Sequence, residues 1–153
     1  CSRAGVSVIS LKAPNGCRAS GASSLLEDGT AMIAVSFRYL SDDHFWFTFF
    51  HELAHLALHG ESHLSIDSCL NQISEEHEEE ADALAEKLLF PESLSFGFRV
   101  TKRGIISCAR KNGIPSGLVV GKLQHDKKIP HSSFNYLKRR YKWEDRVEIP
   151  VLR

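Results

Sequence analysis

The chain has 153 residues, of which 42% are hydrophobic and 25% charged, and its formal net charge is zero. These values are close to those of ordinary globular domains and exclude disorder over most of the chain. No apolar run approaches the roughly 20 residues that a membrane-spanning helix needs, and the N-terminus lacks the build of a signal peptide. The four cysteines are far apart and form no C-x-x-C pair, which is typical of reduced thiols in the cytoplasm.

The charge is divided unevenly along the chain. Residues 1–98 contain 5 Lys and Arg against 15 Asp and Glu, whereas residues 99–153 contain 14 against 4. We expect residues 1–98 to form the core with the functional site, and residues 99–153 to form a helical, basic extension that packs on it within the same domain. A basic face for an acidic partner is the alternative. The chain starts at Cys1 and its only methionine is Met32, so we expect it to be part of a longer protein.

Three strands are predicted before residue 40. Residues 5–12 alternate apolar and polar side chains before a Pro-Asn-Gly turn, and the small polar residues 17–26 are a second candidate. Residues 30–39 alternate most clearly, with a polar face that indicates a sheet with one side in water. This last strand ends just before the next helix, and it is a candidate edge for pairing with an extended peptide; an interior position in the sheet is the alternative.

The next segment, residues 41–60, is predicted to be the central helix. Ser41 is the expected N-cap, and Gly60 follows the last turn. Apolar residues surround this helix on nearly all sides, which is typical of a buried helix. We therefore expect an α+β fold with a small, mostly antiparallel sheet packed on this helix and two to four further helices.

A loop is expected at residues 61–73, followed by a second helix from a Ser74 cap to Phe90, where a proline stops it. The inward stripe of the second helix is predicted to be Ala81, Leu84, Ala85, Leu88 and Leu89. Three more helices are predicted, at residues 101–112, at residues 116–128 and near residues 132–141. The first two superficially suggest a helix-turn-helix, but their apolar residues favour packing over DNA contact.

The central helix carries His51, Glu52 and His55 in the pattern H-E-x-x-H. Residues four apart lie about 40° apart on a helix and one turn along, so both imidazoles can reach one metal ion. Glu52 can face the same ion without binding it, which is where a general base for water must stand. Such polar groups are costly in an apolar helix unless they bind something. We predict His51 and His55 as metal ligands and Glu52 as the catalytic base.

A catalytic zinc site of this kind needs a third protein ligand and one position left for water. The metzincin continuation requires glycine and histidine where the chain has Leu58 and Glu61, so that subclass is excluded. A carboxylate from the second helix is the remaining common solution. A structural zinc module is disfavoured, because closed sites use four protein ligands and only three good ones are visible.

The acidic run at residues 75–82 is the source of this carboxylate, although such a run is often only solvated. Helical phase relative to the inward stripe favours Glu78, with His77 second, and directs Glu79 away from the core. The less favoured alternatives are Glu75, Glu79 and Glu80. Asp82 lies one turn after Glu78 and is placed to hydrogen-bond a ligating histidine, or else it is an exposed helix aspartate.

Two motifs carry a resemblance to a known family. Residues 47–60 read FTFFHELAHLALHG and residues 78–91 read EEEADALAEKLLFP. Together they resemble the ImmA/IrrE metallopeptidases, whose pattern is H-E-x-x-H followed by E-x-x-A-[ND]-x-x-A-x-x-L-L-x-P. The second motif is met by Glu78, Ala81, Asp82, Ala85, Leu88, Leu89 and Pro91. Leu84 stands where phenylalanine is frequent, and Phe90 where methionine is frequent. Residues 113–129 are similar to the C-terminal helices of members fused behind an Xre-type helix-turn-helix domain.

The resemblance implies a zincin-like domain that cuts a transcriptional repressor, with Zn²⁺ held by His51, His55 and Glu78 and with water activated by Glu52. Its partner would be a protein or peptide substrate, DNA would be contacted only through a fused domain outside this sequence, and the compartment would be the cytoplasm. The rival hypothesis is a sensor that reads a metal, peptide or nucleotide and cuts nothing. The intact Glu52 favours activity.

Other polar residues have weaker signals. His59 continues the face of the two motif histidines but stands at the helix end, where a cap or dipole partner is the expected role. A hydrolytic site also needs a donor to the developing oxyanion. The candidates are His44, His63, His125, His131, Tyr39, Tyr136 and Tyr141.

Overall fold

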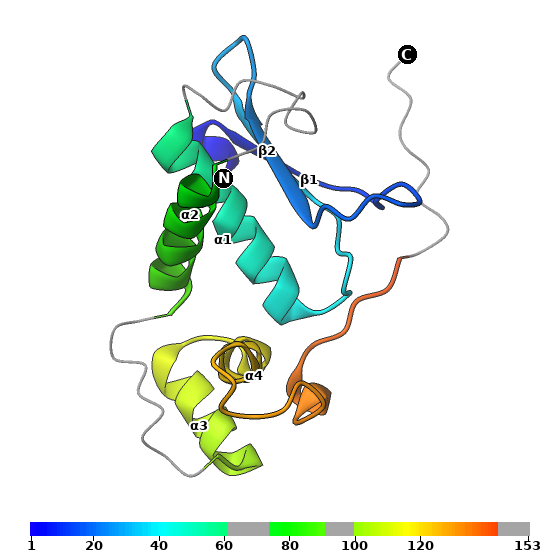
Figure 1. Ribbon diagram of the computed structural model, residues 1–153, viewed down its shortest axis with the longest axis vertical. Coiled ribbons are helices and arrows are strands. Elements are labelled where there is room, and N and C mark those ends of the chain that lie inside the picture. Colours follow the sequence, from blue (N-terminus) through cyan, green and yellow to red (C-terminus); the bar gives the residue numbers. More distant parts are fainter. Residues whose placement is uncertain (61–73, 91–99, 144–153) are drawn as a thin grey trace.

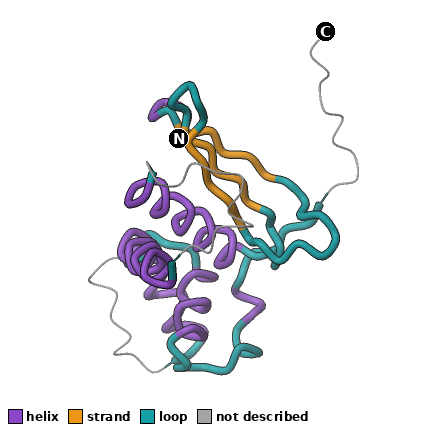
Figure 2. The backbone as a smooth tube through the Cα atoms, turned by 45° about the horizontal axis from the view of Figure 1, so that its top comes forward, coloured by secondary structure: helices purple, strands orange, loops and turns teal. Residues whose placement is uncertain are grey.

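The computed structural model describes residues 1–60, 74–90 and 100–143. Within these segments the chain forms four α-helices and one three-stranded sheet. Figures 1 and 2 show the sheet at one end of the molecule, a long helix beside it, and a pair of helices at the opposite end. The α+β class predicted from the sequence is confirmed.

The sheet consists of β1 (Val6–Ser10), β2 (Gly21–Leu25) and β3 (Ala31–Val35), in the order β1-β3-β2. β2 and β3 form an antiparallel hairpin, whereas β1 runs parallel to β3. A mostly antiparallel sheet is expected from the sequence, and the observed sheet is mixed. The reason is that β2 does not pair with β1. β3 lies between them, antiparallel to β2 and parallel to β1.

The position of β3 decides one alternative left open by the sequence. β3 has a paired strand on each side, so the hypothesis that it is a free edge is wrong and the interior position is correct. Of the two outer strands of the sheet as the structure describes it, β2 is the one that lies against the central helix. Any main-chain pairing with a peptide beside this helix would therefore involve β2.

The central helix is α1 (Asp42–His59), with Ser41 as its N-cap residue. Its Phe49 packs on the inner face of β3, where Ile33 and Val35 are fully buried. α1 contacts the sheet, the second helix and the fourth helix, which confirms its central place. Gly60 follows its last turn, as expected, with a φ of −49°, so it does not adopt the left-handed conformation in which glycine often ends a helix.

The second helix, α2 (Glu75–Leu89), begins as predicted. The Ser74 side chain accepts a hydrogen bond from the backbone N–H of His77, which satisfies one free donor of the first turn. The predicted inward residues Ala81, Ala85 and Leu89 are buried against α1, but Leu88 is 50% exposed. The buried row thus runs through every fourth residue, and Leu88 lies beside this row and faces solvent.

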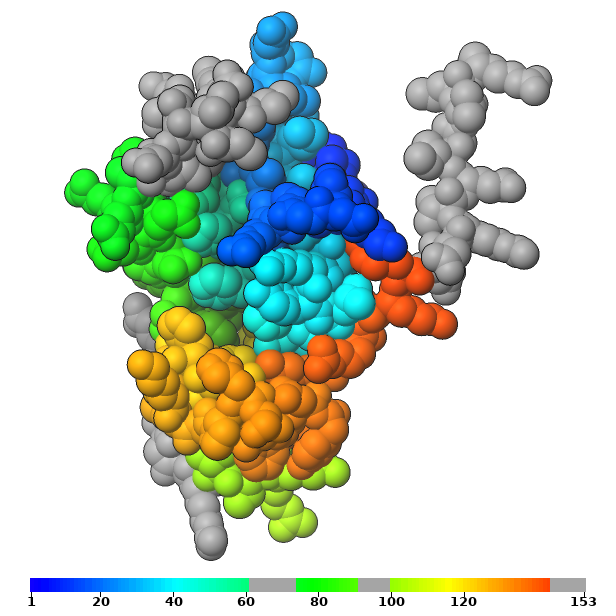
Figure 3. Space-filling model, turned by 45° about the vertical axis from the view of Figure 1, so that its right-hand side comes forward, coloured from blue at the N-terminus to red at the C-terminus, as the bar shows by residue number. Residues whose placement is uncertain are grey.

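The C-terminal part consists of α3 (Lys102–Asn112), α4 (Ser116–His125) and a 3-10 turn, η3 (Asn135–Leu137). This short turn replaces the helix expected near residues 132–141. α3 and α4 share a buried apolar cluster that includes Val119, Val120 and Leu123, as the packing interpretation predicts. Figure 3 shows the segment after α4, coloured orange to red, against the cyan N-terminal part of α1.

Some predictions fall outside this description. The loop expected at residues 61–73, including His63, and the end of the basic tail lie outside the described residues. Of the cysteines, the three that the structure describes are free. Among the described segments, every helix is too short or too polar to cross a bilayer.

Candidate metal centre

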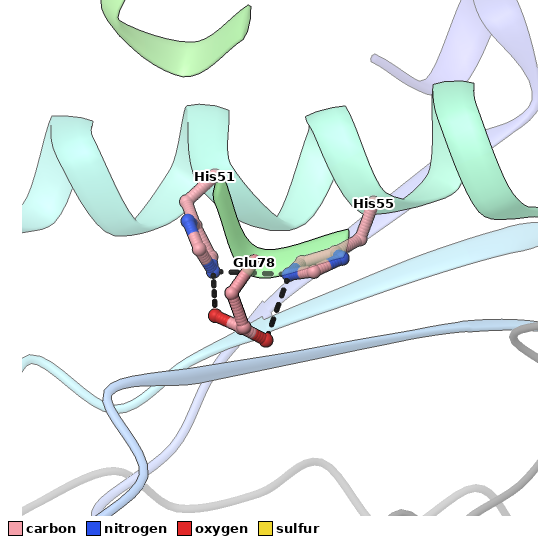
Figure 4. A group of neighbouring side chains, drawn as sticks. All are labelled: His51, His55 and Glu78. Carbon is pink, nitrogen blue, oxygen red and sulfur yellow. Dashed lines mark hydrogen bonds and ion pairs between the residues drawn. The ribbon is translucent and has the colours of Figure 1, made fainter. Parts of the chain in front are cut away.

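Three donor groups converge where α1 and α2 lie side by side (Figure 4). The Nε2 atoms of His51 and His55 are 3.0 Å apart. The Glu78 carboxylate reaches both rings, with one oxygen 3.3 Å from Nε2 of His51 and the other 3.4 Å from Nε2 of His55. The histidines come from successive turns of α1, and Glu78 comes from the first turn of α2, just after the Ser74 cap.

The spacing of these atoms fits a metal ion. A tetrahedral zinc ion with bonds of about 2.0–2.1 Å separates its ligand atoms by about 3.3–3.4 Å. The histidine nitrogens are 3.0 Å apart, and each lies 3.3 or 3.4 Å from a different oxygen of Glu78. One ligand atom from each of the three residues lies within 4.8 Å of the other two. Two imidazoles and one carboxylate are also the donor set of catalytic zinc sites that keep a position open for water. The group could therefore hold a divalent metal ion.

Asp82 fixes the orientation of one histidine. Its carboxylate accepts a hydrogen bond of 2.8 Å from Nδ1 of His51, which leaves the lone pair of Nε2 free to face the metal position. Asp82 lies one helical turn after Glu78 on α2, so the same helix supplies both the third donor and the support for the first. Of the two alternatives left open by the sequence, the structure places Asp82 against the histidine.

Glu52 lies on the side of α1 that faces β2. It is buried, and Ser23 of β2 donates a 2.8 Å hydrogen bond to one of its carboxylate oxygens. Burial raises the pKa of Glu52 above its ordinary value, and the Ser23 hydrogen bond partly opposes the rise. A carboxylate with a raised pKa is a better proton acceptor, which suits a general base.

The sequence did not single out β2 as part of the site. Its segment Gly21–Leu25 contains mainly small residues, and at Gly21 an added Cβ would lie 2.6 Å from Thr48 and 2.7 Å from Oε1 of Glu52. Glycine therefore allows β2 to approach α1 closely enough for Ser23 to reach Glu52. The run of small residues in a strand was the available signal, because small side chains permit close approach of a helix.

The remaining candidates occupy other positions. His77 stacks on His59, with ring centroids 4.0 Å apart, and Nε2 of His59 lies 3.6 Å from a Glu80 oxygen. His59 is buried at the end of α1, where it packs against α2 instead of capping the helix in solvent. Glu79 is exposed, as its helical phase predicts.

The candidate oxyanion donors are separated by the fold. Tyr39, His44 and His125 line a cavity that also contains Asp82. Tyr141 packs on Phe37 and Phe45, near the start of α1, and Tyr136 is 68% exposed on the C-terminal part. The first three thus share a cavity with the residue that supports His51, and His131 lies near enough to His44 to act on its charge.

Most of the chain matches a known protein family. A family model described as an IrrE N-terminal-like domain, of the peptidase type, matches residues 1–114. The chain belongs to this family. Among curated proteins, no sequence matches it.

The IrrE-like match contains every residue of the candidate metal centre and ends just after α3. It confirms the family expected from the two motifs, and the chain is accordingly a metallopeptidase-like domain. α4, whose residues line the cavity beside Asp82, lies beyond the matched range.

Proposed function

We propose that the chain is a zinc-dependent endopeptidase that hydrolyses a peptide bond in a protein substrate. The observation that carries this proposal is the convergence of the His51, His55 and Glu78 donor atoms beside the buried carboxylate of Glu52. A transcriptional repressor in the cytoplasm is the substrate class that the family resemblance favours. Contact with DNA would be made only by a fused domain outside this sequence.

Each residue has a defined task in this reaction. Zinc held by His51, His55 and Glu78 would polarise the substrate carbonyl and lower the pKa of water. Glu52 accepts the proton of the attacking water and later gives it to the leaving amine. Ser23 keeps the Glu52 carboxylate in place, and Asp82 keeps the His51 ring in the orientation that presents Nε2.

The test combines elemental analysis with a cleavage assay. The purified chain should contain zinc and should cut a candidate repressor at one position, seen by mass spectrometry. Glu52→Gln should keep its zinc but lose at least about 100-fold in rate, the usual contribution of a general base. His51→Ala and Glu78→Ala should lose both zinc and cleavage.

Glu79→Gln is the matched control, because Glu79 is an exposed neighbour on the same helix; it should keep zinc and activity. A Glu52→Gln variant that cuts at the parental rate would show that the base is another group. Full zinc occupancy without cleavage of any repressor tested would favour the sensor hypothesis.

A further inference from the structure

A cavity of about 390 Å³ lies beside the candidate metal centre, between α1, α2 and α4. Its apolar wall is formed by Tyr39, Phe47, Phe90 and Leu118. Such a volume is within the usual range of ligand pockets and far exceeds that of a few waters. The pocket is partly open to solvent, so an incoming group can enter it.

The pocket continues the groove that holds the metal ligands. α1 and α2 run antiparallel, because His51 meets Asp82 while His55, one turn later, meets Glu78. One turn before His51 on α1 stands Phe47, whose ring stacks on the His51 ring with centroids 6.1 Å apart. Asp82 itself contacts His51 and lines the pocket. The pocket therefore begins next to the first metal ligand.

The charged side chains of the pocket wall contact polar partners on the wall or behind it. Lys122 lies 2.6 Å from Glu86 and 2.6 Å from Asp126. Asp43 lies 2.6 Å from the buried Lys138, and Asp82 binds His51. Each charged side chain described on the wall thus already contacts a polar partner, and none stands there as an isolated ion.

The half-exposed histidine beside Tyr39 reinforces this conclusion. His44 stacks on Tyr39 with ring centroids 4.2 Å apart, and burial lowers its pKa, which favours the neutral ring near pH 7. Selection by the pocket must then come from shape and from apolar contact with the aromatic rings and Leu118.

We propose that this pocket is the substrate subsite for a large apolar side chain, of the leucine, methionine or phenylalanine class, on the residue adjacent to the scissile bond. This inference rests on the proposed function, because it needs a metal ion beside His51 to define where the bond lies. If the pocket binds this side chain, α4 also contributes to substrate specificity, through Leu118 and through the exposed His125 at its end.

The test uses small metal-binding probes and does not depend on cleavage. N-acetyl amino acid hydroxamates chelate zinc through the hydroxamate and present one side chain next to it. Their dissociation constants are measured by calorimetry on the zinc-loaded Glu52→Gln variant. The leucine and phenylalanine probes should bind about 50-fold more tightly than the alanine probe, because three or more extra carbon atoms leave water. Aspartate and lysine probes should bind no better than alanine.

Two pocket variants and a matched control locate the selectivity. Tyr39→Ala removes an aromatic wall and should weaken the leucine and phenylalanine probes about fivefold to tenfold. His125→Trp changes a side chain that is 78% exposed and should narrow the entrance of the pocket. It should weaken binding of the phenylalanine probe most. Tyr136→Ala alters an exposed tyrosine away from the pocket and should leave the dissociation constants of all probes unchanged. The alanine probe should stay within twofold in all three.

The outcomes separate the two hypotheses. If the zinc-loaded protein binds all the probes equally well, whatever their side chain, the pocket inference is wrong and the metal site is unaffected. Selectivity that survives both pocket variants would overturn it as well. Failure to bind zinc at all would refute the proposed function, and the pocket inference with it.

Discussion

The ring of His51 has contacts at both of its nitrogens, so its orientation depends on neighbouring side chains. Its Nδ1 meets the Asp82 carboxylate at 2.8 Å, while its Nε2 faces Glu78 at 3.3 Å. The first contact decides which nitrogen carries the proton and keeps the ring from rotating. The geometry of the donor set is therefore fixed partly by a residue that would not touch the metal.

Asp82→Ala should accordingly weaken zinc binding by about 10- to 100-fold, the usual cost of removing the hydrogen-bond partner of a ligating histidine. Zinc affinity is measured by competition with a chromogenic chelator at constant pH. Glu79→Ala, on the exposed side of the same helix, is the control and should leave the affinity unchanged. An unaltered affinity in Asp82→Ala would mean that the ring is held by other contacts.

At the scale of elements, the site depends on how closely β2 lies against α1. Gly21 faces Thr48 and Glu52, and no Cβ fits between them. The backbone of Gly21 is not in the left-handed region, so glycine is needed there for space and not for conformation. Since β2 carries Ser23, the spacing of strand and helix also sets the hydrogen bond to Glu52.

Gly21→Ala should therefore destabilise the fold by about 1–3 kcal/mol, the typical cost of overpacking. It should reduce catalysis more than zinc binding, because Glu52 is displaced while the three donors stay on α1 and α2. Urea unfolding and zinc titration measure the two effects. Ala22→Ser is the matched control at the next, exposed position of β2; a similar loss in both variants would contradict the steric argument.

At the scale of the whole molecule, the segment after η3 joins the C-terminal part to the start of α1. Ser41 and Arg140 form a β-bridge, and Asp42 exchanges backbone and side-chain hydrogen bonds with Arg139. Beside them, Lys138 and Asp43 form an ion pair of 2.6 Å in which both side chains are less than 10% exposed. α4 also comes close, since a Cβ at its Gly117 would collide with Asp42.

Lys138→Met should lower the free energy of unfolding by about 3–5 kcal/mol at pH 7, because it leaves the Asp43 carboxylate buried without its partner. Urea denaturation measures the change. Lys128→Met is the control, because that lysine approaches Asp126 at 3.5 Å and is 46% exposed; its loss should cost less than about 1 kcal/mol. Equal effects of the two substitutions would refute the role of the buried pair.

The same pair predicts a pH dependence. Burial alone would raise the pKa of Asp43, but the hydrogen bonds from Lys138 and Ser41 and the charge of Lys138 outweigh it, so the pKa lies below its ordinary value of 3.8. The stabilisation is thus complete above about pH 4 and is lost as the pH falls through the lowered pKa. In Lys138→Met the penalty should shrink on acidification, because protonation removes the uncompensated charge. Unfolding free energies from pH 3 to pH 7 test both slopes.

Features that depend on local sequence could be predicted, and Glu78 is the clearest example. Helical phase and the family pattern both selected Glu78, and the structure brings its carboxylate to the two motif histidines. Three strands, the Ser74 cap and the helix from Asp42 were predictable because each depends on local periodicity or local hydrogen bonds. The order of the strands was not, because pairing joins residues distant in sequence. The exposure of Leu88 was not predicted either, because helical phase does not say how wide the stripe covered by α1 is.

The sequence by itself determined which groups can bind a metal, because H-E-x-x-H on a helix fixes their relative positions through helix geometry alone. Only the tertiary structure decided that β2 and not β3 is the edge beside α1, that Ser23 supports Glu52, and that α4 closes a pocket next to His51. These features depend on distances between segments far apart in the chain. Such distances follow from the packing of whole elements, which no local pattern encodes.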